Sequence, residues 1–393
     1  MESNPSLLVG NGFNMALSSC IGQITLDYES ISKEVRKRSQ KLGNGLYEFL
    51  EKNKTECDLE LLLSILNNSL QCLKSSTSDY CTCKSDYKEK IKLHRSTLKE
   101  LVIEIMTSDE FHPQHSKIFS ENSYLESCKK NLEAFDRIFT INYDLILYWL
   151  LNKKHLLVET DENGEVIHGK FKDGFSSRRE LRPINDDNNE VYEHLYGYAG
   201  TNNHPNLYFL HGALHLLQKN GYAYKVVKNG SQSHLNILEL RNTLINDYND
   251  FDNLIVFDAT SHNKIRNIYS NAYLEKAYDK IITIPNDMVI YGCNVLDKYG
   301  EKINLGNDIH LWRRIINSRS KKIYVGISKE DNQELNQFAC DLAKELRGLR
   351  CIHDPEIDIY CFPQCKVNIW NSKNFYSEVV SNSSKGYSAA LKD

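Results

Sequence analysis

Five short apolar runs constrain the fold of this chain more than any other feature of its 393 residues. Each run is rich in β-branched, leucine or aromatic residues, and the runs span residues 6–9, 137–140, 207–210, 288–291 and 322–325. Continuous rather than alternating hydrophobicity is typical of strands that are covered on both faces. Residues 58–73 and 86–106, which lie between runs, repeat apolar residues at helical spacing. Strands that alternate with helices predict an α/β fold with a parallel, doubly wound sheet.

The chain length favours one large α/β domain with an insertion, or two domains. We predict a domain over residues 1–335 that includes a helical insertion at about 30–130. Residues 155–205 are rich in Asp, Asn, Gly, Arg and Tyr with little periodicity, which predicts an irregular excursion that forms either a cap or a lobe on the substrate side. Residues 336–393 are expected to form a C-terminal extension, loosely ordered after Trp370.

Composition excludes several classes of partner. The net charge of −4 gives no reason to expect nucleic acid or an anionic membrane as the main partner. The first residues show no secretion signal, and the longest apolar stretch, residues 145–151, is far below the roughly 20 residues that span a bilayer. Eleven cysteines scattered over the chain are typical of reduced thiols. We therefore expect a cytoplasmic protein.

Small or polar residues directly follow four of the five predicted strands. They form the segments Gly10-Asn11-Gly12-Phe13-Asn14, Thr140-Ile141-Asn142-Tyr143-Asp144, His211-Gly212 and Gly292-Cys293-Asn294. In an open parallel sheet, ligands bind outside the carboxyl ends of the strands, and all these ends lie at one edge. The sequence therefore predicts a binding site that combines the four segments.

The Gly10-x-Gly12 segment suits a phosphate-binding turn. Glycine lets the backbone approach a pyrophosphate, and free N–H groups at the start of the following helix would meet its charge. The third glycine of the full dinucleotide fingerprint is missing, because Met15 stands at its place. A tight turn without a ligand is the alternative.

Asn142, Asp144 and His211 are the candidates for chemistry. Burying the Asn142 amide and the Asp144 carboxylate beside apolar residues is unfavourable unless they are hydrogen-bonded, which suggests a role in binding. The alternative is that both side chains cap the next helix. His211 ends an apolar strand, and Gly212 would leave room for a ligand. The alternatives for His211 are a satisfied core histidine and a His-x₃-His zinc pair with His215.

In this order, the four segments resemble the motifs of sirtuins. Those motifs are a Gly-x-Gly loop, Thr-x-Asn-x-Asp, His-Gly and a Gly-Thr-Ser-like adenosine loop. The chain is most similar to bacterial sirtuin-like proteins, whose hallmarks its segments 8–13, 58–60, 140–149, 209–214, 260–264 and 273–274 also resemble. The resemblance runs from residue 6 to about residue 330, and the shared order of the motifs is its specific part.

The resemblance implies a Rossmann-like NAD⁺ site. The implied NAD⁺-contacting residues are Gly10, Asn11, Gly12, Asn14, Thr140, Asp144, Gly292, Cys293 and Asn294. Within this set, Asp144 would hold the nicotinamide carboxamide. Asn142 would position water or the ribose near the anomeric carbon. His211 would act as general base toward a ribose hydroxyl, with a pKa near neutral.

Deacetylating sirtuins also carry a four-cysteine zinc module built from Cys-x-x-Cys-type pairs, which this chain lacks. Its irregular groups are Cys72, Cys81 and Cys83, and separately Cys351, His353, Cys361 and Cys365, and we expect no metal. Asn14 also replaces the nucleotide-loop serine of typical sirtuins. Both departures argue against deacetylation.

Sirtuin-like bacterial proteins without the zinc module resemble NAD⁺ hydrolases of anti-phage defence. The resemblance thus implies an NAD⁺ glycohydrolase that releases nicotinamide and ADP-ribose and depletes NAD⁺. It also implies a homo-oligomer with a possible defence partner such as a ring-forming ATPase or helicase. The alternatives are a non-enzymatic NAD⁺ or ADP-ribose sensor, and a protein deacylase or ADP-ribosyltransferase.

Overall fold

The computed structural model gives the fold of most of the chain. It describes residues 4–21, 28–43, 45–52, 84–108, 122–152, 171–177, 195–199, 205–227, 251–256, 260–297, 299–329, 332–350 and 357–386, with residues 159–160, 166–167, 240 and isolated positions between 62 and 72.

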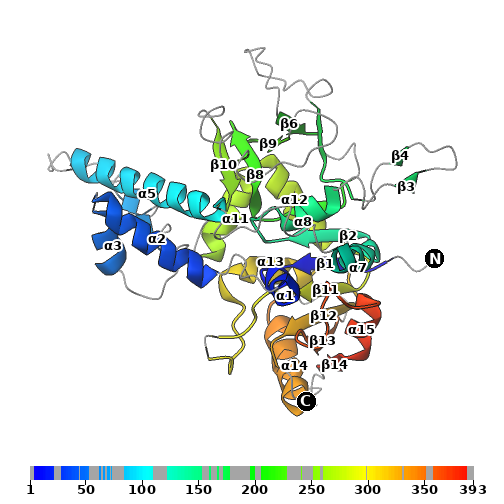
Figure 1. The fold of residues 1–393 in the computed structure, drawn as a ribbon. Helices are drawn as coiled ribbons and strands as arrows, with labels where there is room; N and C mark the ends of the chain where they lie inside the picture. Colours follow the sequence, from blue (N-terminus) through cyan, green and yellow to red (C-terminus); the bar gives the residue numbers. More distant parts are fainter. Residues whose placement is uncertain are drawn as a thin grey trace.

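A seven-stranded sheet forms the centre of the molecule (Figure 1). Its strands are β1 (Ser6–Val9), β2 (Arg137–Thr140), β7 (Leu207–Phe209), β11 (Met288–Tyr291), β12 (Lys322–Ile327), β13 (Asp358–Pro363) and β14 (Ser384–Lys385). They lie in the order β14-β13-β12-β11-β1-β2-β7, and every neighbouring pair is parallel except β13 and β14. The six parallel strands thus follow the order 3-2-1-4-5-6 of a Rossmann fold, which confirms the predicted fold class.

Helices flank this sheet. They are α1 (Gly12–Ile21), α7 (Asn122–Glu133), α8 (Ile146–Asn152), α11 (Ser261–Tyr269), α12 (Ala272–Ile282), α13 (Ile309–Ile316), α14 (Asn332–Arg347) and α15 (Phe375–Ser381), with the short 3₁₀ helix η3 (Gly306–Asp308) before α13. The strands are buried along nearly their whole length, as continuous hydrophobicity predicts.

Between α1 and β2 the chain forms helices, as the predicted insertion requires. The helices α2 (Tyr28–Leu42), α3 (Leu46–Lys52) and α5 (Lys84–Met106) pack on one another and extend to the side of the sheet (Figure 1). This arm places more than a hundred residues of sequence between β1 and β2, which are adjacent in space.

A second, antiparallel sheet is built from strands before and after β7, and the sequence analysis did not predict it. Its strands lie in the order β10 (Asp252–Ile255), β8 (Gly212–Lys219), β9 (Tyr222–Val226), β6 (Leu195–Tyr198) and β5 (Phe175–Ser177). The predicted irregular excursion at 155–205 is therefore wrong for β5 and β6, and wrong also for the two-stranded pair β3 (Glu159–Thr160) and β4 (Val166–Ile167). Residues 178–194 of the excursion lie outside the described residues.

The strands of the central sheet continue past residue 335. Residues 336–393, which the sequence analysis sets apart as an extension, contribute β13, β14 and most of α14. The predicted loose order after Trp370 is wrong for α15 and β14. Trp370 is buried, and its indole Nε1–H donates to the carbonyl of Phe13 at 2.8 Å, so this segment packs on α1. None of the described helices is long and apolar enough to cross a membrane.

Candidate active site

Four neighbouring strands of the central sheet end in register. Their last paired residues form one row, which consists of Phe209, Thr140, Val9 and Tyr291. Two positions beyond this row lie four of the predicted site residues, which are His211, Asn142, Asn11 and Cys293. Adjacent strands are about 4.8 Å apart, so the register brings residues that are far apart in sequence to one sheet edge. We call these four residues the edge row.

The edge row crosses the point where the strand order reverses, between β1 and β11. Here the β1–α1 turn packs directly on the loop after β11. The N–H of Gly12 donates to the carbonyl of Gly292 at 2.9 Å, and a Cβ on Gly12 would lie 2.4 Å from the Gly292 Cα. Gly292 has φ +76°, and its own Cβ would lie 2.6 Å from the nitrogen of Phe13. Contact between two loops therefore requires these glycines, whether or not a pyrophosphate also approaches them.

The start of α1 differs from the expectation of free amides. The N–H of Phe13 donates to Gly10, and the N–H groups of Asn14 and Met15 both donate to the carbonyl of Asn11. The predicted free N–H groups are thus already donors within the protein at residues 12–15. The partial positive charge of the helix N-terminus remains available to an anion at the turn.

Asp144 joins the turn to α8. One carboxylate oxygen accepts the N–H of Ile146 at 2.8 Å, and the other accepts the Asn14 side-chain amide at 2.6 Å. The first contact confirms the alternative that Asp144 caps the next helix. The second contact connects Asp144 to the glycine turn. Asp144 is therefore a structural anchor inside the site.

Asn142 does not share this capping role. Its backbone N–H donates to the Thr140 hydroxyl at 3.0 Å, and its side-chain Nδ2 donates to the carbonyl of Gly10 at 3.1 Å. The end of β2 is thereby held against the glycine turn, with the Asn142 side chain only 8% exposed. The predicted residues Gly10, Asn11, Gly12, Asn14, Thr140, Asn142, Asp144 and Gly292 are consequently brought together in one hydrogen-bonded unit.

Cys293 and Asn294 differ from each other in environment. Cys293 is buried, and burial raises the pKa of its thiol, which makes it an inert packing residue. Its Sγ lies 2.9 Å from where a Cβ of Gly10 would stand. Asn294 is exposed, and its Oδ1 accepts the N–H of Leu296 at 3.1 Å. Asn294 therefore supports its own turn and lies apart from the hydrogen-bonded unit.

His211 follows β7, the neighbour of β2, and its side chain contacts residues outside the edge row. Its Nε2 lies 3.4 Å from His310 Nε2 and 3.7 Å from Asp308 Oδ1. Burial lowers the pKa of His211 to about 3, and the nearby Asp308 carboxylate only partly offsets this effect. The assumption of a pKa near neutral is therefore wrong, and the imidazole is neutral at physiological pH.

Gly212 also differs from its predicted role. It has φ +75°, and a Cβ there would lie 1.8 Å from the carbonyl oxygen of Leu254 in β10. The missing side chain makes room for this strand rather than for a ligand. Nearby, His215 is enclosed by the Tyr148 and Phe209 rings, and the cluster of possible metal-binding groups around His211 does not include it. The His-x₃-His zinc pair has no support among these contacts.

Sequence reasoning missed the two nearest partners of His211 and the role of a third residue. Asp308 and His310 lie at the start of α13, and Lys264 lies in α11. The Lys264 ammonium is only 2% exposed and contacts Asp308 Oδ1 at 2.8 Å. Burial alone would raise the pKa of Asp308, but His211 and Lys264 hold it below its usual value. The Asp-x-His spacing before an apolar helix was the only sequence signal.

His211, Asp308 and His310 are the described residues that could hold a metal ion. One ligand atom from each lies within 4.8 Å of the others. The cysteine groups noted from sequence offer less. Cys361 is buried in β13 while Cys365 is exposed, and Cys81, Cys83, Cys351 and His353 lie outside the described residues.

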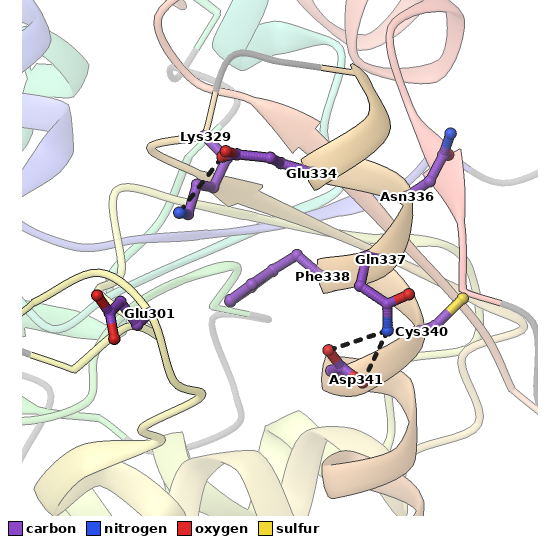
Figure 2. A pocket seen from close by; sticks show the side chains of 8 residues that line it. All are labelled: Glu301, Lys329, Glu334, Asn336, Gln337, Phe338, Cys340 and Asp341. Atoms are coloured by element: carbon purple, nitrogen blue, oxygen red, sulfur yellow. Dashed lines mark hydrogen bonds and ion pairs between the residues drawn. The ribbon is translucent and has the colours of Figure 1, made fainter.

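A surface pocket of about 640 Å³ lies beside α14 (Figure 2). Figure 2 shows Phe338 pointing from α14 toward the loop that carries Glu301, with Lys329 paired to Glu334 at 3.4 Å. The lining residues are Glu301, Lys329, Glu334, Asn336, Gln337, Phe338, Cys340 and Asp341. Three carboxylates against one lysine do not suit a pyrophosphate, and none of the predicted site residues lines the pocket.

Comparison with known proteins adds one family. A family described as a domain of unknown function (DUF4917) matches residues 7–370, which include the parallel strands of the central sheet from Leu7 onward and the edge row, but not β14. No curated protein matches the chain.

Proposed function

The chain belongs to the DUF4917 family, and we propose that it is an NAD⁺ glycohydrolase, which releases nicotinamide and ADP-ribose. The edge row carries this proposal. A Rossmann-ordered sheet binds dinucleotides in the crevice where its strand order reverses. An amide and a neutral imidazole stand on neighbouring strands at that edge, and the N-terminus of α1 opens onto it.

The proposed reaction breaks the bond between the nicotinamide nitrogen and the ribose anomeric carbon. The bonding electrons leave with the pyridinium nitrogen, which becomes neutral nicotinamide. A water oxygen bonds to the anomeric carbon and passes a proton to the ribose oxygen that His211 has deprotonated, so one proton in all is released. Asn142 would position the water or the ribose, and His211 would accept a proton from a ribose hydroxyl. The low pKa leaves His211 deprotonated at neutral pH but makes it a weak base, so this role requires its pKa to rise when NAD⁺ binds.

Asp144 would hold the nicotinamide carboxamide. Its two oxygens each accept one hydrogen bond within the protein, and a carboxylate offers about four acceptor positions in total. Acceptor capacity therefore remains for the carboxamide N–H groups. The Asn14 contact would also keep the carboxylate aligned as the ligand arrives.

The proposed site is closed in this conformation. Asn142, Asp144 and His211 are each less than a tenth exposed, so NAD⁺ enters only if covering residues move. A closed site suits an effector that stays inactive until a trigger or partner acts. With the resemblance of its motifs, this closure supports the further proposal of a homo-oligomeric anti-phage effector that depletes NAD⁺ and responds to a defence partner.

Product analysis tests the proposal. The purified protein would be incubated with NAD⁺, alone and with the product of the neighbouring gene, and nicotinamide and ADP-ribose would be quantified. We expect both products in equal amounts, and an Asn142→Ala variant at least about a hundredfold slower. Asn336→Ala, at an exposed position on α14, is the matched control.

Two outcomes would reject the proposal. Stabilisation by NAD⁺ without any product under either condition would indicate a sensor instead. Consumption of NAD⁺ only when an acyl-lysine peptide or protein acceptor is added would indicate a deacylase or an ADP-ribosyltransferase.

A further inference from the structure

Three side chains gather near the inner nitrogen of His211, of which Lys264 and His310 are buried and Asp308 is about a third exposed. Lys264, Asp308 and His310 come from α11, η3 and α13, which are elements outside the sheet. Their contacts form a chain: Lys264 Nζ to Asp308 Oδ1 at 2.8 Å, Asp308 Oδ1 to His211 Nε2 at 3.7 Å, and His211 Nε2 to His310 Nε2 at 3.4 Å. The mechanism proposed above uses only His211 of these four.

We propose that the Lys264–Asp308 ion pair is a positioning unit for His211, which fixes the ring with Nε2 turned inward and Nδ1 as its proton acceptor. The effect of this unit on catalysis rests on the proposed function, whereas its effect on the tautomer of His211 does not. Asp308 is the only carboxylate among the described groups that face His211.

Lys264 has a distinct task in this unit. Asp308 alone beside His211 would favour a protonated, positively charged ring, which is not a base. The Lys264 ammonium balances the carboxylate, so a proton on His211 or His310 would leave one uncompensated positive charge in a buried space. Among the described residues, Asp308, Lys264 and His310 are the charged or titratable groups facing His211, and both histidines are neutral in this balance.

The same charge balance disfavours a metal centre. His211, Asp308 and His310 are close enough to share an ion, but Lys264 already occupies one oxygen of the carboxylate. A divalent cation would join a buried ammonium around a single negative charge, which is a repulsive arrangement. The geometry therefore points to an orienting ion pair.

Ring ¹⁵N NMR of histidine-labelled full-length protein tests the unit without any substrate. The His211 signals would be assigned by their loss in His211→Gln. We expect a neutral ring with the proton on Nε2 near neutral pH, and little protonation down to about pH 5. Lys264→Met should raise the pKa of His211, because it removes the balancing positive charge. Asp308→Asn should instead abolish the fixed tautomer.

Asp358→Asn is the matched control, since Asp358 pairs with Lys385 at 2.8 Å at the opposite end of the strands. It should leave the His211 signals unchanged. In the assay of NAD⁺ turnover, Asp308→Asn should lower kcat at least about tenfold with little change in KM. A wild-type protein without turnover, with or without the neighbouring gene product, would reject the proposed function. The NMR result would still show whether the ion pair positions His211.

Three results would overturn the proposal. A proton on Nδ1 in the wild-type ring would place the acceptor on the wrong side. Identical His211 signals in Lys264→Met and the wild type would show that the ion pair does not control the ring. Stoichiometric Zn²⁺ binding that shifts both the His211 and His310 signals would identify a metal site instead.

Discussion

At the scale of single residues, close backbone contacts determine where glycine is required. Gly292 and Gly300 have similar φ angles of +76° and +72°. A Cβ on Gly292 would meet the backbone of Phe13 and Gly12 within 2.8 Å, whereas a Cβ on Gly300 would meet nothing within 4 Å. Substitutions at these two glycines therefore separate the cost of a steric clash from the cost of a strained backbone conformation.

We predict that Gly292→Ala destabilises the protein far more than Gly300→Ala. The Gly300 variant carries only the strain of a left-handed conformation, about 1–2 kcal/mol, and the Gly292 variant adds a backbone clash worth at least about 2 kcal/mol more. Urea unfolding of both variants measures the difference. Equal losses would show that the β1–α1 turn does not pack on the β11 loop as described.

The buried histidines make stability depend on pH. Burial holds the pKa of His215 well below its usual value, and neither ring nitrogen has a hydrogen-bond partner among the described residues. Below about pH 6.5 the unfolded chain binds a proton that the folded chain does not, so the free energy of unfolding falls as the solution is acidified. His211 and His310 contribute in the same direction.

His215→Phe should therefore flatten this acid dependence. Removing one buried histidine lowers the slope of the unfolding free energy by up to about 1.4 kcal/mol per pH unit between roughly pH 4 and 6. The exposed His262 serves as control, and His262→Phe should keep the wild-type slope. Denaturant unfolding at several pH values gives both slopes, and an unchanged slope in His215→Phe would contradict the assigned burial.

Several residues of the site could be predicted from sequence, because they directly follow recognisable strands. Asn142 and His211 are examples, and the sheet register brings them to one edge. The partner Asp308 could not be found in this way. It lies 44 residues from Lys264 and almost a hundred from His211, and only the packing of α11 and α13 brings the three together.

At the scale of elements, one buried asparagine ties α7 to the C-terminal segment. The Asn131 side-chain amide donates to the carbonyls of Ile369 and Ser372, both at 2.9 Å, and its oxygen accepts the N–H of Phe375 at 3.0 Å. This segment also carries Trp370, which packs on α1. Residues beyond 335 thereby support the helix that begins at the glycine turn.

Asn131→Ala should consequently destabilise the whole domain. The Ile369 carbonyl and the Phe375 N–H would lose their partner, at about 1–3 kcal/mol for each group that stays unsatisfied. The Ser372 carbonyl keeps the Ser127 hydroxyl at 3.2 Å. The expected loss is thus about 2 kcal/mol or more in equilibrium unfolding, against little change for the exposed Asn336→Ala. A loss below about 1 kcal/mol would mean that this segment is not held through Asn131.

The strands that the sequence analysis did not predict share physical features that explain why they were missed. β5 and β6 are only three and four residues long, and they gain their order by pairing, β6 with β9 and β5 with β6. β13 alternates buried and half-buried residues at its start, so it lacks the continuous apolar run that marks the other parallel strands. Local pattern therefore predicts central strands better than edge strands and hairpins.

At the scale of the whole molecule, strand order positions the site. Alternation of strands and helices predicts a parallel sheet, but many strand orders share that pattern. The order 3-2-1-4-5-6 places the glycine turn at the reversal and gives β1 a neighbour from each half of the chain. The helical arm and the second sheet are then additions to a Rossmann-like framework.

The position of bound ADP-ribose tests the central claim most directly. A crystal structure of the protein with this product would show where it binds. We predict the pyrophosphate at the β1–α1 turn against Gly292, and the terminal ribose between Asn142 and His211. ADP-ribose bound only in the pocket beside α14, or an empty edge row at saturating ligand, would contradict the account.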